Sequence, residues 1–474
     1  MRSSLQLMAL SALPFTQVSA EKILGAYIFA RHGDRSAKIL KNTQLTDLGY
    51  SQVYLTGSSY HNRYINSSSS QYIQDMSEQV VDLSQLTASA PADAVLQNSA
   101  TGFLQGVYPP VGSVSSQELA NGTTVETPLN GYQLIPLSVI DSGASSEDST
   151  WLQSTTDCQN AIVSSNNYYS SELYNNLLDS TRDFYQSLSS LINTSFSESD
   201  MSFKNAYTIF DYLNVGSIHN TTNVPTDDQL HQALLLANIE QYNLAYNSSE
   251  TIRAVAGSTL AAEMLMGLNE TVTGKGEVKL HIEFGSYGTF LSYFGLAKLP
   301  AADVDFTGIP DYASSMVWEL VTNSTSDSFP DASEISVRFA FHNGTLTGSS
   351  IPTEYNLYGQ SSTVISWSTF VEETEKIAVM DTEQWCQVCG NTDGQCASSS
   401  DSSDSGSAST DSAPSGSGGI SKAVAGVIGA MVTLAVILGL EALFLLVGGF
   451  RITKKGQAAV AAAAAAQVAE DKSA

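Results

Sequence analysis

The sequence predicts an α/β domain that carries a largely helical insertion and is followed by a single membrane-spanning helix. The apolar run Ile23–Ala30 leads directly into a glycine-containing loop, as expected for a buried parallel strand. Strand-like runs return at residues 278–284 and 335–341, far along the chain. The two ends of the domain are therefore expected to build one sheet, with the intervening segment inserted between its strands.

The middle of the chain shows helical rather than strand periodicity. Apolar residues between positions 172 and 192 recur at helical spacing, namely Leu173, Leu177, Phe184, Leu188 and Ile192. Residues 229–245 and 252–268 also favour helix. We therefore expect helical structure in these three segments.

Charge and length limit the classes of function. The chain has 474 residues, with 20 Lys and Arg against 47 Asp and Glu, for a formal net charge of -27. This length is enough for a large core with accessory segments. The excess of acidic residues repels polyanions, so no nucleic-acid partner is expected, and it favours mildly acidic surroundings, in which carboxylates begin to protonate.

Two signals at the sequence level indicate the secretory pathway. Residues 1–20 combine Arg2, an apolar stretch and the small-residue ending Val18-Ser19-Ala20, which predicts a signal peptide; a frayed N-terminal helix is the alternative. Asn-X-Ser/Thr sequons are spread over the middle of the chain and predict glycosylation at Asn66, Asn121, Asn193, Asn220, Asn247, Asn269, Asn323 and Asn343.

The chain has four cysteines, at Cys158, Cys386, Cys389 and Cys396. A Cys-x2-Cys pair is also found in zinc sites, but no histidine lies near this cluster, and we expect no metal. In an oxidising compartment the simpler interpretation is two disulfides. Three connectivities remain open at this stage.

The C-terminal part has the composition of a membrane anchor. Residues 397–419 are almost all Ser, Asp, Gly, Ala and Thr, which predicts a flexible stalk. Residues 420–450 contain an apolar run long enough to cross a bilayer, interrupted by Glu441, and the basic residues after it place the tail 451–474 in the cytosol. We expect a single-pass type I protein at the plasma membrane or cell surface. A glycolipid anchor is the alternative.

The loop Arg31-His32-Gly33-Asp34-Arg35 follows the first predicted strand, where ligands bind α/β sheets. Two arginines in one short turn can form forked hydrogen bonds with phosphate oxygens, and a neutral imidazole between them can attack phosphorus. Gly33 allows close approach of the backbone. A solvated polar loop is the alternative.

These residues give the sequence its resemblance to the histidine acid phosphatase family, the branch of the histidine phosphatase superfamily that includes fungal acid phosphatases and phytases. The family signature Arg-His-Gly-x-Arg is similar to residues 31–35, although Ala37 stands where a proline is common. Further blocks agree in type and order over about residues 22–396: Leu45–Gln52, Ser99–Gly106 with Pro109-Pro110, Pro310–Ser314 with Glu319-Leu320, and Val337-Arg338 near Asn343-Gly344.

The resemblance implies a phosphoglycerate-mutase-like sheet domain flanked by helices, over residues 21–396. It also implies that His32 is a nucleophile that becomes phosphorylated, with Arg31 and Arg35 binding the phosphoryl oxygens. No cofactor is implied. The expected ligand is a phosphomonoester or another small anionic molecule.

Two further features depart from the family pattern, a residue pair and a single position. Ser286 and Tyr287, which we assign to substrate binding, align with the His-Asp pair whose carboxylic acid protonates the leaving group. Val95 aligns with a further phosphate-binding arginine. His281 and Glu283 alternate with apolar residues on a predicted strand, so we expect them to face the surface.

The other basic residues have ordinary structural interpretations. We expect surface or strand-edge charges at Arg63, Arg182, Arg253 and Arg338, and exposed or hydrogen-bonded surface positions for His61, His219, His231 and His342. Three functions follow as hypotheses: a weak phosphomonoesterase acting through His32, a catalytically impaired family member that binds a phosphorylated or anionic ligand, and a structural surface glycoprotein.

Overall fold

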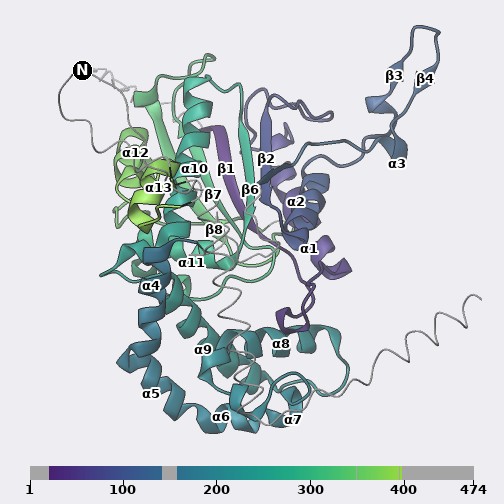
Figure 1. Cartoon of the computed structure of the whole chain (residues 1–474). Helices are drawn as coiled ribbons and strands as arrows, with labels where there is room; N and C mark the ends of the chain where they lie inside the picture. Colours follow the sequence, from purple (N-terminus) through teal and green to yellow (C-terminus); the bar gives the residue numbers. More distant parts are fainter. Residues whose placement is uncertain (1–20, 141–156, 349, 394–395, 398–474) are drawn as a thin grey trace, which may run out of the picture. The chain divides into compact units, whose positions relative to one another are not determined.

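The apolar run near the N-terminus forms the central strand of the sheet. The computed structural model describes residues 21–140, 157–348, 350–393 and 396–397. Its strands are β1 (Lys22–Arg31), β2 (Leu86–Pro91), β3 (Gln117–Glu118), β4 (Thr124–Val125), β5 (Ser138–Ile140), β6 (Leu280–Gly285), β7 (Ser315–Thr322), β8 (Ile335–His342), β9 (Thr353–Glu354) and β10 (Val364–Ser366). Eight of them form one sheet in the order β10-β8-β7-β1-β6-β2-β5, with β9 paired to β8 (Figure 1).

The sheet is mixed, and both ends of the domain contribute to it as expected. β1 pairs in parallel with β6 and antiparallel with β7, and β2 pairs in parallel with β6 and β5. β7 and β8 form an antiparallel pair. The predicted strands at 278–284 and 335–341 are thus confirmed as β6 and β8.

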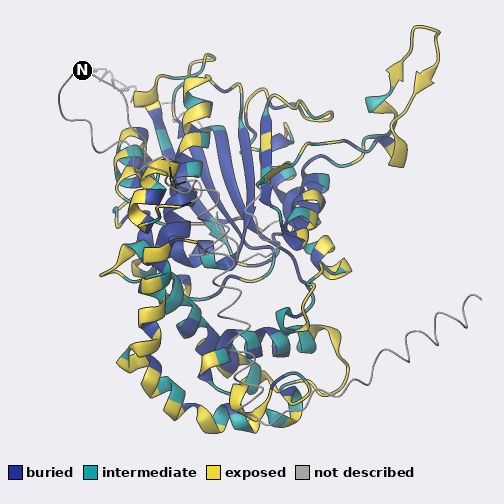
Figure 2. Cartoon of the chain, viewed as in Figure 1, coloured by how far each residue is buried: buried dark blue, intermediate teal, exposed yellow. Residues whose placement is uncertain are grey.

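Helices cover both faces of β1. Tyr27 and Phe29 point to one face, into a core shared with α10 (Val255–Thr273) and α11 (Tyr287–Leu296). Ala26, Ile28 and Ala30 point to the other face, into a core shared with α1 (Asp47–Tyr60) and α2 (Ala94–Val107). Figure 2 shows the resulting buried sheet between helices that expose only their outer sides.

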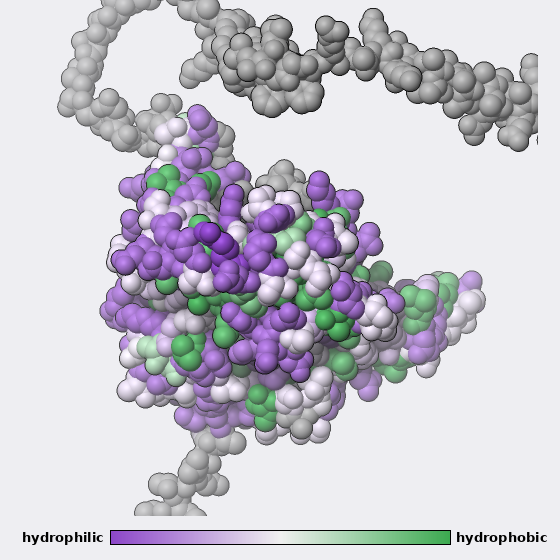
Figure 3. Space-filling model, turned by 90° about the horizontal axis from the view of Figure 1, so that it is seen from below, coloured by the Kyte–Doolittle hydropathy of each residue, from purple (hydrophilic) through white to green (hydrophobic). Residues whose placement is uncertain are grey.

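The segment between β5 and β6 is the predicted helical insertion. Before α10 it contains α4 (Gln159–Asn167), α5 (Glu172–Ser180), α6 (Arg182–Ser187), α7 (Ser189–Ile192), α8 (Ala206–His219) and α9 (Asp227–Ala245). The helices have a core of their own that includes Tyr185, Ile192, Phe203 and Ile209. Seen from below in Figure 3, this side of the molecule is mostly hydrophilic, with hydrophobic residues scattered among the polar ones.

The helical structure expected over residues 172–192 is confirmed, but it is divided. Three short helices occupy this segment, with breaks at Thr181 and Leu188. The hydroxyl of Thr181 donates to the carbonyl oxygen of Leu177 at 2.6 Å, a local hydrogen bond that competes with regular helix geometry. The expectations for 229–245 and 252–268 are confirmed by α9 and α10.

The remaining elements lie at the edges of the domain. The β3–β4 hairpin and α3 (Pro128–Gly131) project from the body (Figure 1), and α3 is a turn with positive φ at Leu129 and Asn130 rather than a regular helix. α12 (Trp367–Glu375) packs near β8 and β10, and α13 (Thr382–Cys389) ends the described helices.

The predicted segments for secretion and anchoring lie largely outside the described residues. These are the signal peptide at 1–20, nearly all of the stalk at 397–419, the membrane helix at 420–450 and the tail at 451–474. Of the helices in the described part of the chain, none is both long enough and apolar enough to cross a membrane. None of the eight sequon asparagines is buried, and their glycosylation stays a prediction.

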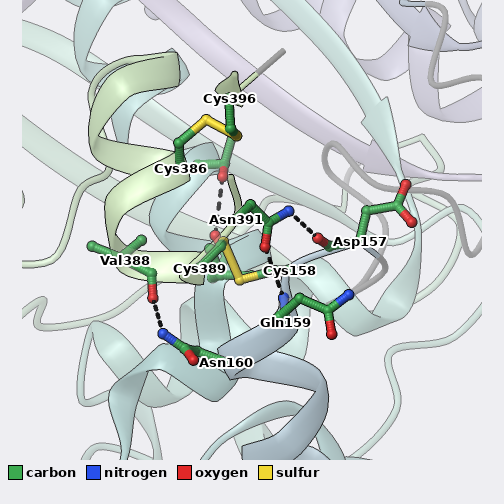
Figure 4. Close-up of a disulfide and its surroundings, with 11 residues drawn as sticks. Asp157, Cys158, Gln159, Asn160, Cys386, Val388, Cys389, Asn391 and Cys396 are labelled. Atoms are coloured by element: carbon green, nitrogen blue, oxygen red, sulfur yellow. Dashed lines mark hydrogen bonds between the residues drawn. A yellow bond between two sulfur atoms is a disulfide. The ribbon is translucent and has the colours of Figure 1, made fainter. Parts of the chain in front are cut away.

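The four cysteines form two disulfides, as expected. Cys158, just before α4, is bonded to Cys389 at the end of α13, across 231 residues of sequence (Figure 4). Cys386 is bonded to Cys396 across 10 residues. Asn391 adds hydrogen bonds to the backbone of residues 157 and 159, so the first disulfide fastens the start of the helical insertion to the last helix of the domain.

The two disulfides should differ in their contribution to stability. In the chain-entropy model, the long loop closed by Cys158–Cys389 stabilises the fold by about 5 kcal/mol and the short loop closed by Cys386–Cys396 by about 3 kcal/mol. Replacing Cys158 and Cys389 with serine should therefore lower the free energy of unfolding more than replacing Cys386 and Cys396. Denaturant unfolding of both double variants measures this, and equal losses would contradict it.

The expectation that His281 and Glu283 face the surface is wrong. Both are buried, because β6 lies between two parallel neighbours and has both faces covered. Glu283 accepts a hydrogen bond from the hydroxyl of Tyr27. His281 lies within hydrogen-bond distance of the hydroxyls of Thr87 and Thr271, at 3.0 and 3.1 Å.

Burial shifts the titration of these groups. Loss of solvation, with a smaller effect of Glu263, raises the pKa of Glu283 to about 8. Burial also raises the pKa of Glu240 on α9 to about 7 and lowers the pKa of His281 to about 4. At neutral pH, Glu283 is therefore mainly protonated and His281 is neutral.

The two raised carboxyl pKa values predict a fold that is more stable in mild acid than in mild base. In the unfolded chain both carboxyl groups have a pKa near 4.5. Between pH 4.5 and about pH 8 the folded state therefore binds more protons than the unfolded state. Their stabilisation is fully present below about pH 4.5 and is lost as the pH rises through about 7 and about 8. The lowered pKa of His281 has the opposite effect, because it destabilises the folded state below about pH 6.5. This is the effect of one group, whereas two carboxyl groups stabilise the fold in acid.

Thermal unfolding at about pH 5 and about pH 8 measures the effect, and the midpoint should be several degrees higher at the lower pH. Glu283→Gln should remove much of the difference, because the amide does not titrate. Glu372→Gln on the exposed side of α12 is the matched control and should keep it. A midpoint that rises between these pH values would contradict the assignment.

Candidate active site

The predicted catalytic loop lies at the carboxyl edge of the sheet. In the parallel pair β1–β6, Arg31 lies opposite Gly285. The residues that follow the two strands, His32 and Ser286, therefore leave the sheet side by side. The structure thus brings together the two segments that the sequence analysis assigned to one site.

Close backbone packing fixes the shape of the loop. A Cβ atom on Gly33 would lie 2.2 Å from the carbonyl oxygen of Gly49 near the start of α1, so only glycine fits there. The amide of Gly33 donates to Ser99 Oγ at 3.3 Å, and the amide of Asp34 donates to Gln52 Oε1 at 2.8 Å. The sequence blocks 45–52 and 99–106 therefore hold the loop in place.

His32 is buried and has an assigned tautomer. Its Nδ1 lies 2.8 Å from the carbonyl oxygen of Gly33. A carbonyl oxygen only accepts hydrogen bonds, so Nδ1 carries the proton and the lone pair is on Nε2. The ring packs against Tyr312, with 5.5 Å between the ring centroids. His32 therefore has the protonation state that a nucleophilic imidazole requires.

Arg31 is held by its backbone and by aromatic rings. Its Nη1 donates to the carbonyl oxygen of Pro310. The guanidinium carbon lies 4.9 Å from the ring centroid of Tyr312 and 5.3 Å from that of Tyr287. These contacts fix a buried positive charge beside His32.

Arg35 is paired with a carboxylate that sequence reasoning missed. Its Nη1 lies 2.9 Å from Oδ1 and 3.3 Å from Oδ2 of Asp211, and its Nη2 donates to the hydroxyl of Tyr207 at 3.1 Å. Asp211 and Tyr207 belong to α8, about 175 residues further along the chain. Both partners of the ion pair are buried. A lone aspartate in a helix gives no signal of such a role in one sequence.

Tyrosine rings form one wall of the site. Tyr207 and Tyr287 pack with ring centroids 4.7 Å apart, and the hydroxyl of Tyr287 donates to Gln241 Oε1 at 2.9 Å. Lys38 Nζ lies 5.6 Å from the ring centroid of Tyr207. Burial raises the pKa of Tyr312 above its usual value, although Arg35 and Arg31 counteract this. Tyr312 is therefore a neutral hydroxyl close to both arginines.

Asp34 forms hydrogen bonds with side chains of neighbouring elements. Its Oδ2 lies 2.7 Å from Nε2 of His219, the last residue of α8, and accepts from the hydroxyl of Thr46. His219, expected at an ordinary surface position, is thus hydrogen-bonded to the catalytic loop. Glu283 is bonded to Tyr27 within the core. Neither carboxyl belongs to the segment directly after β6, where Ser286 and Tyr287 lie.

No arginine replaces the one expected at position 95. Val95 is buried in α2. Arg63 and Arg338 both bind the buried Glu319, at 2.7 and 2.6 Å, so the expectation that they are surface or edge charges is wrong. Arg253 is also buried, against the backbone of residues 164 and 243.

Arg182 is a surface charge, as expected, and forms an exposed ion pair with Asp179 at 3.0 Å. Among the described residues, the positive charges brought to the loop are those of Arg31, Arg35 and Lys38.

No protein-family model matches the sequence, and no curated protein matches it in sequence. Solved structures share its fold. The phytase of Hafnia alvei in its apo form is 13% identical, with a TM-score of 0.51, over 78% of this chain and 98% of the phytase. The Citrobacter braakii phytase is 13% identical, with a TM-score of 0.51, over 78% of this chain and 99% of the phytase. For the Klebsiella sp. ASR1 phytase the corresponding identity, TM-score and two coverages are 12%, 0.52, 76% and 95%.

At this level of identity the likeness concerns the fold and leaves the chemistry to be argued from the site. The described part of the chain is a mixed α/β structure with a central sheet and a helical insertion. It has the fold of these phytases.

Proposed function

We propose that the protein is a phosphomonoester hydrolase of low turnover that acts through a phosphohistidine at His32. The observation that supports the proposal is the protonation state and orientation of that imidazole. Its Nδ1 is fixed by the carbonyl of Gly33, which leaves the lone pair on Nε2, and buried arginines lie on both sides of it in the same turn. A neutral, oriented imidazole between two guanidinium groups is suited to phosphoryl transfer.

The reaction proceeds in two displacements. Nε2 of His32 attacks phosphorus, the ester P–O bond breaks and the alcohol oxygen leaves with the bonding electrons. Water then attacks the phosphorus of the phosphohistidine, the P–N bond breaks and inorganic phosphate is released, which returns His32 to its starting state. Arg31 and Arg35 stabilise the charge on the transferred oxygens in both steps.

Departure of the alcohol is the weak point of this site. An alkoxide is a poor leaving group, and a general acid that protonates it contributes about 10² to 10⁴-fold. At this position the chain has Ser286 and Tyr287, and the hydroxyl proton of Tyr287 is donated to Gln241. A tyrosine hydroxyl, with an ordinary pKa of about 10, is a weaker acid than a carboxyl group.

The second candidate is a non-catalytic protein that binds a phosphorylated or other anionic small molecule at the same loop. The buried pair between Arg35 and Asp211 favours it, because this carboxylate offsets part of the positive charge that transition-state stabilisation uses. The structural surface glycoprotein has no such specific observation in its favour.

We also propose a location in the secretory pathway and at the cell surface, as a single-pass type I membrane protein. Two disulfides are typical of an oxidising compartment, and the sequon asparagines are accessible. The apolar run at 420–450 supports the membrane anchor.

The proposal predicts a covalent intermediate and a strong dependence on the leaving group. The full-length protein, incubated with radiolabelled nitrophenyl phosphate at mildly acidic pH and denatured in alkali, should retain label. His32→Ala should abolish the labelling. His231→Ala, on the exposed side of α9, is the matched control and should keep it.

Nitrophenyl phosphate should be cleaved about 10² to 10⁴ times faster than an alkyl phosphate, because a nitrophenolate leaves without protonation. The double change Ser286→His with Tyr287→Asp should raise alkyl phosphate turnover more than nitrophenyl phosphate turnover. Absence of label would favour the second candidate. Efficient hydrolysis of alkyl phosphates by the unaltered protein would show that another acid reaches the leaving oxygen.

A further inference from the structure

Helix α8 presents three polar side chains to the catalytic loop. Tyr207, Asp211 and His219 are separated by four and eight residues, which places them along one side of the helix. Tyr207 and Asp211 bind Arg35, and His219 binds Asp34. The insertion thus supplies part of the site.

Asp211 is held by the side chain of Arg35 and by the backbone of Lys38. Both of its carboxylate oxygens lie within 3.3 Å of Nη1 of Arg35, and Oδ2 also accepts from the backbone amide of Lys38 at 2.8 Å. Arg35 is fully buried and Asp211 is only 3% exposed, so solvent does not weaken their attraction as it does at a surface. The side chain of Arg35 and the backbone amide of Lys38 together hold the carboxylate in one orientation.

A carboxylate and a phosphoryl group present similar oxygen acceptors to a guanidinium group. Asp211 therefore offers Arg35 the kind of partner that a bound phosphoryl group would offer. Arg31, Arg35 and Lys38 bring three positive charges to the loop, and the carboxylate of Asp211 offsets one of them. Lys38 lies over the tyrosine rings of Tyr207 and Tyr287.

We infer that Asp211 is a specificity-determining residue of this site: its fixed carboxylate makes the site favour singly charged anions over doubly charged ones. The inference rests on the proposed function in one respect, that the loop receives an anionic ligand. It does not depend on turnover. A doubly charged ligand gains less from Arg35 than it would without Asp211, and it is repelled by the carboxylate at short range.

The test uses two probes that have the same shape, no ester bond and different charge. At about pH 8, phenylphosphonate is mainly doubly charged and benzenesulfonate is singly charged. Calorimetric titration of the full-length protein should show benzenesulfonate binding at least as tightly as phenylphosphonate. In Asp211→Asn the order should invert, with phenylphosphonate affinity rising by on the order of tenfold to hundredfold and benzenesulfonate affinity changing less.

Asp179→Asn is the matched control, because it removes a carboxylate from an exposed ion pair with Arg182. It should leave both affinities unchanged. Unchanged preference in Asp211→Asn, or weaker phenylphosphonate binding by a folded variant, would overturn the inference.

Stability gives a second measurement that works even for a weakened variant. Asp211→Asn removes the carboxylate that is paired with the buried charge of Arg35, which is destabilising, and a doubly charged ligand can replace part of the lost negative charge. Phenylphosphonate should therefore raise the unfolding midpoint of Asp211→Asn more than that of the unaltered protein. Equal shifts, or a variant that stays unfolded with the probe present, would show that Asp211 is only a structural counterion.

The two proposals fail separately. If His32 is never phosphorylated but the probe preference inverts in Asp211→Asn, the hydrolase proposal is wrong and the role of Asp211 stands. If label is trapped on His32 while the preference does not change, the reverse holds.

Discussion

The parallel pairing of β1 with β6 is the constraint on which the site depends. Because both strands end at the same edge, with Arg31 opposite Gly285, residues more than 250 positions apart in sequence leave the sheet together. The loop after β1 supplies the imidazole, and the turn after β6 supplies Ser286 and Tyr287. A shift of this register by one residue would turn every side chain of β1 to the other face and disrupt both cores.

Glu319, Glu283 and Asp211 are three of the buried carboxyl groups of this acidic protein, and each has a different environment. Glu319 on β7 is bound by Arg63 and by Arg338 on β8, so its negative charge is compensated. Glu283 instead stays protonated, since burial raises its pKa. Asp211 is paired with a residue of the catalytic loop. The first two groups lie within the sheet, whereas Asp211 lies beside the loop that follows β1.

The sequence predicted those features that local patterns determine. A short apolar run before a glycine-containing loop is enough to place His32 at a strand end, and helical periodicity is enough to identify the insertion. The cysteine count and the expected compartment predicted two disulfides, but the pairing of Cys158 with Cys389 depends on the fold.

Other features depend on contacts that local patterns do not record. His281 and Glu283 alternate with apolar residues as surface residues do, yet β6 is covered on both faces, and only the strand order shows this. Asp211 and His219 face the loop because of how the insertion packs. The breaks at Thr181 and Leu188 leave no trace in the apolar periodicity of residues 172–192.

Under the proposed function, the site combines two separable departures from an efficient phosphatase. Replacement of the acid by Ser286 and Tyr287 would affect the step in which the leaving oxygen departs, so it would lower the rate without preventing binding. The valine at position 95 and the carboxylate of Asp211 would act on charge, so they would affect the bound ligand and the transition state together. On this proposal, the loop can hold a ligand without cleaving it. For this reason the phytase fold alone does not determine activity, and the charge balance around Arg35 and the acidity available at Tyr287 must each be measured.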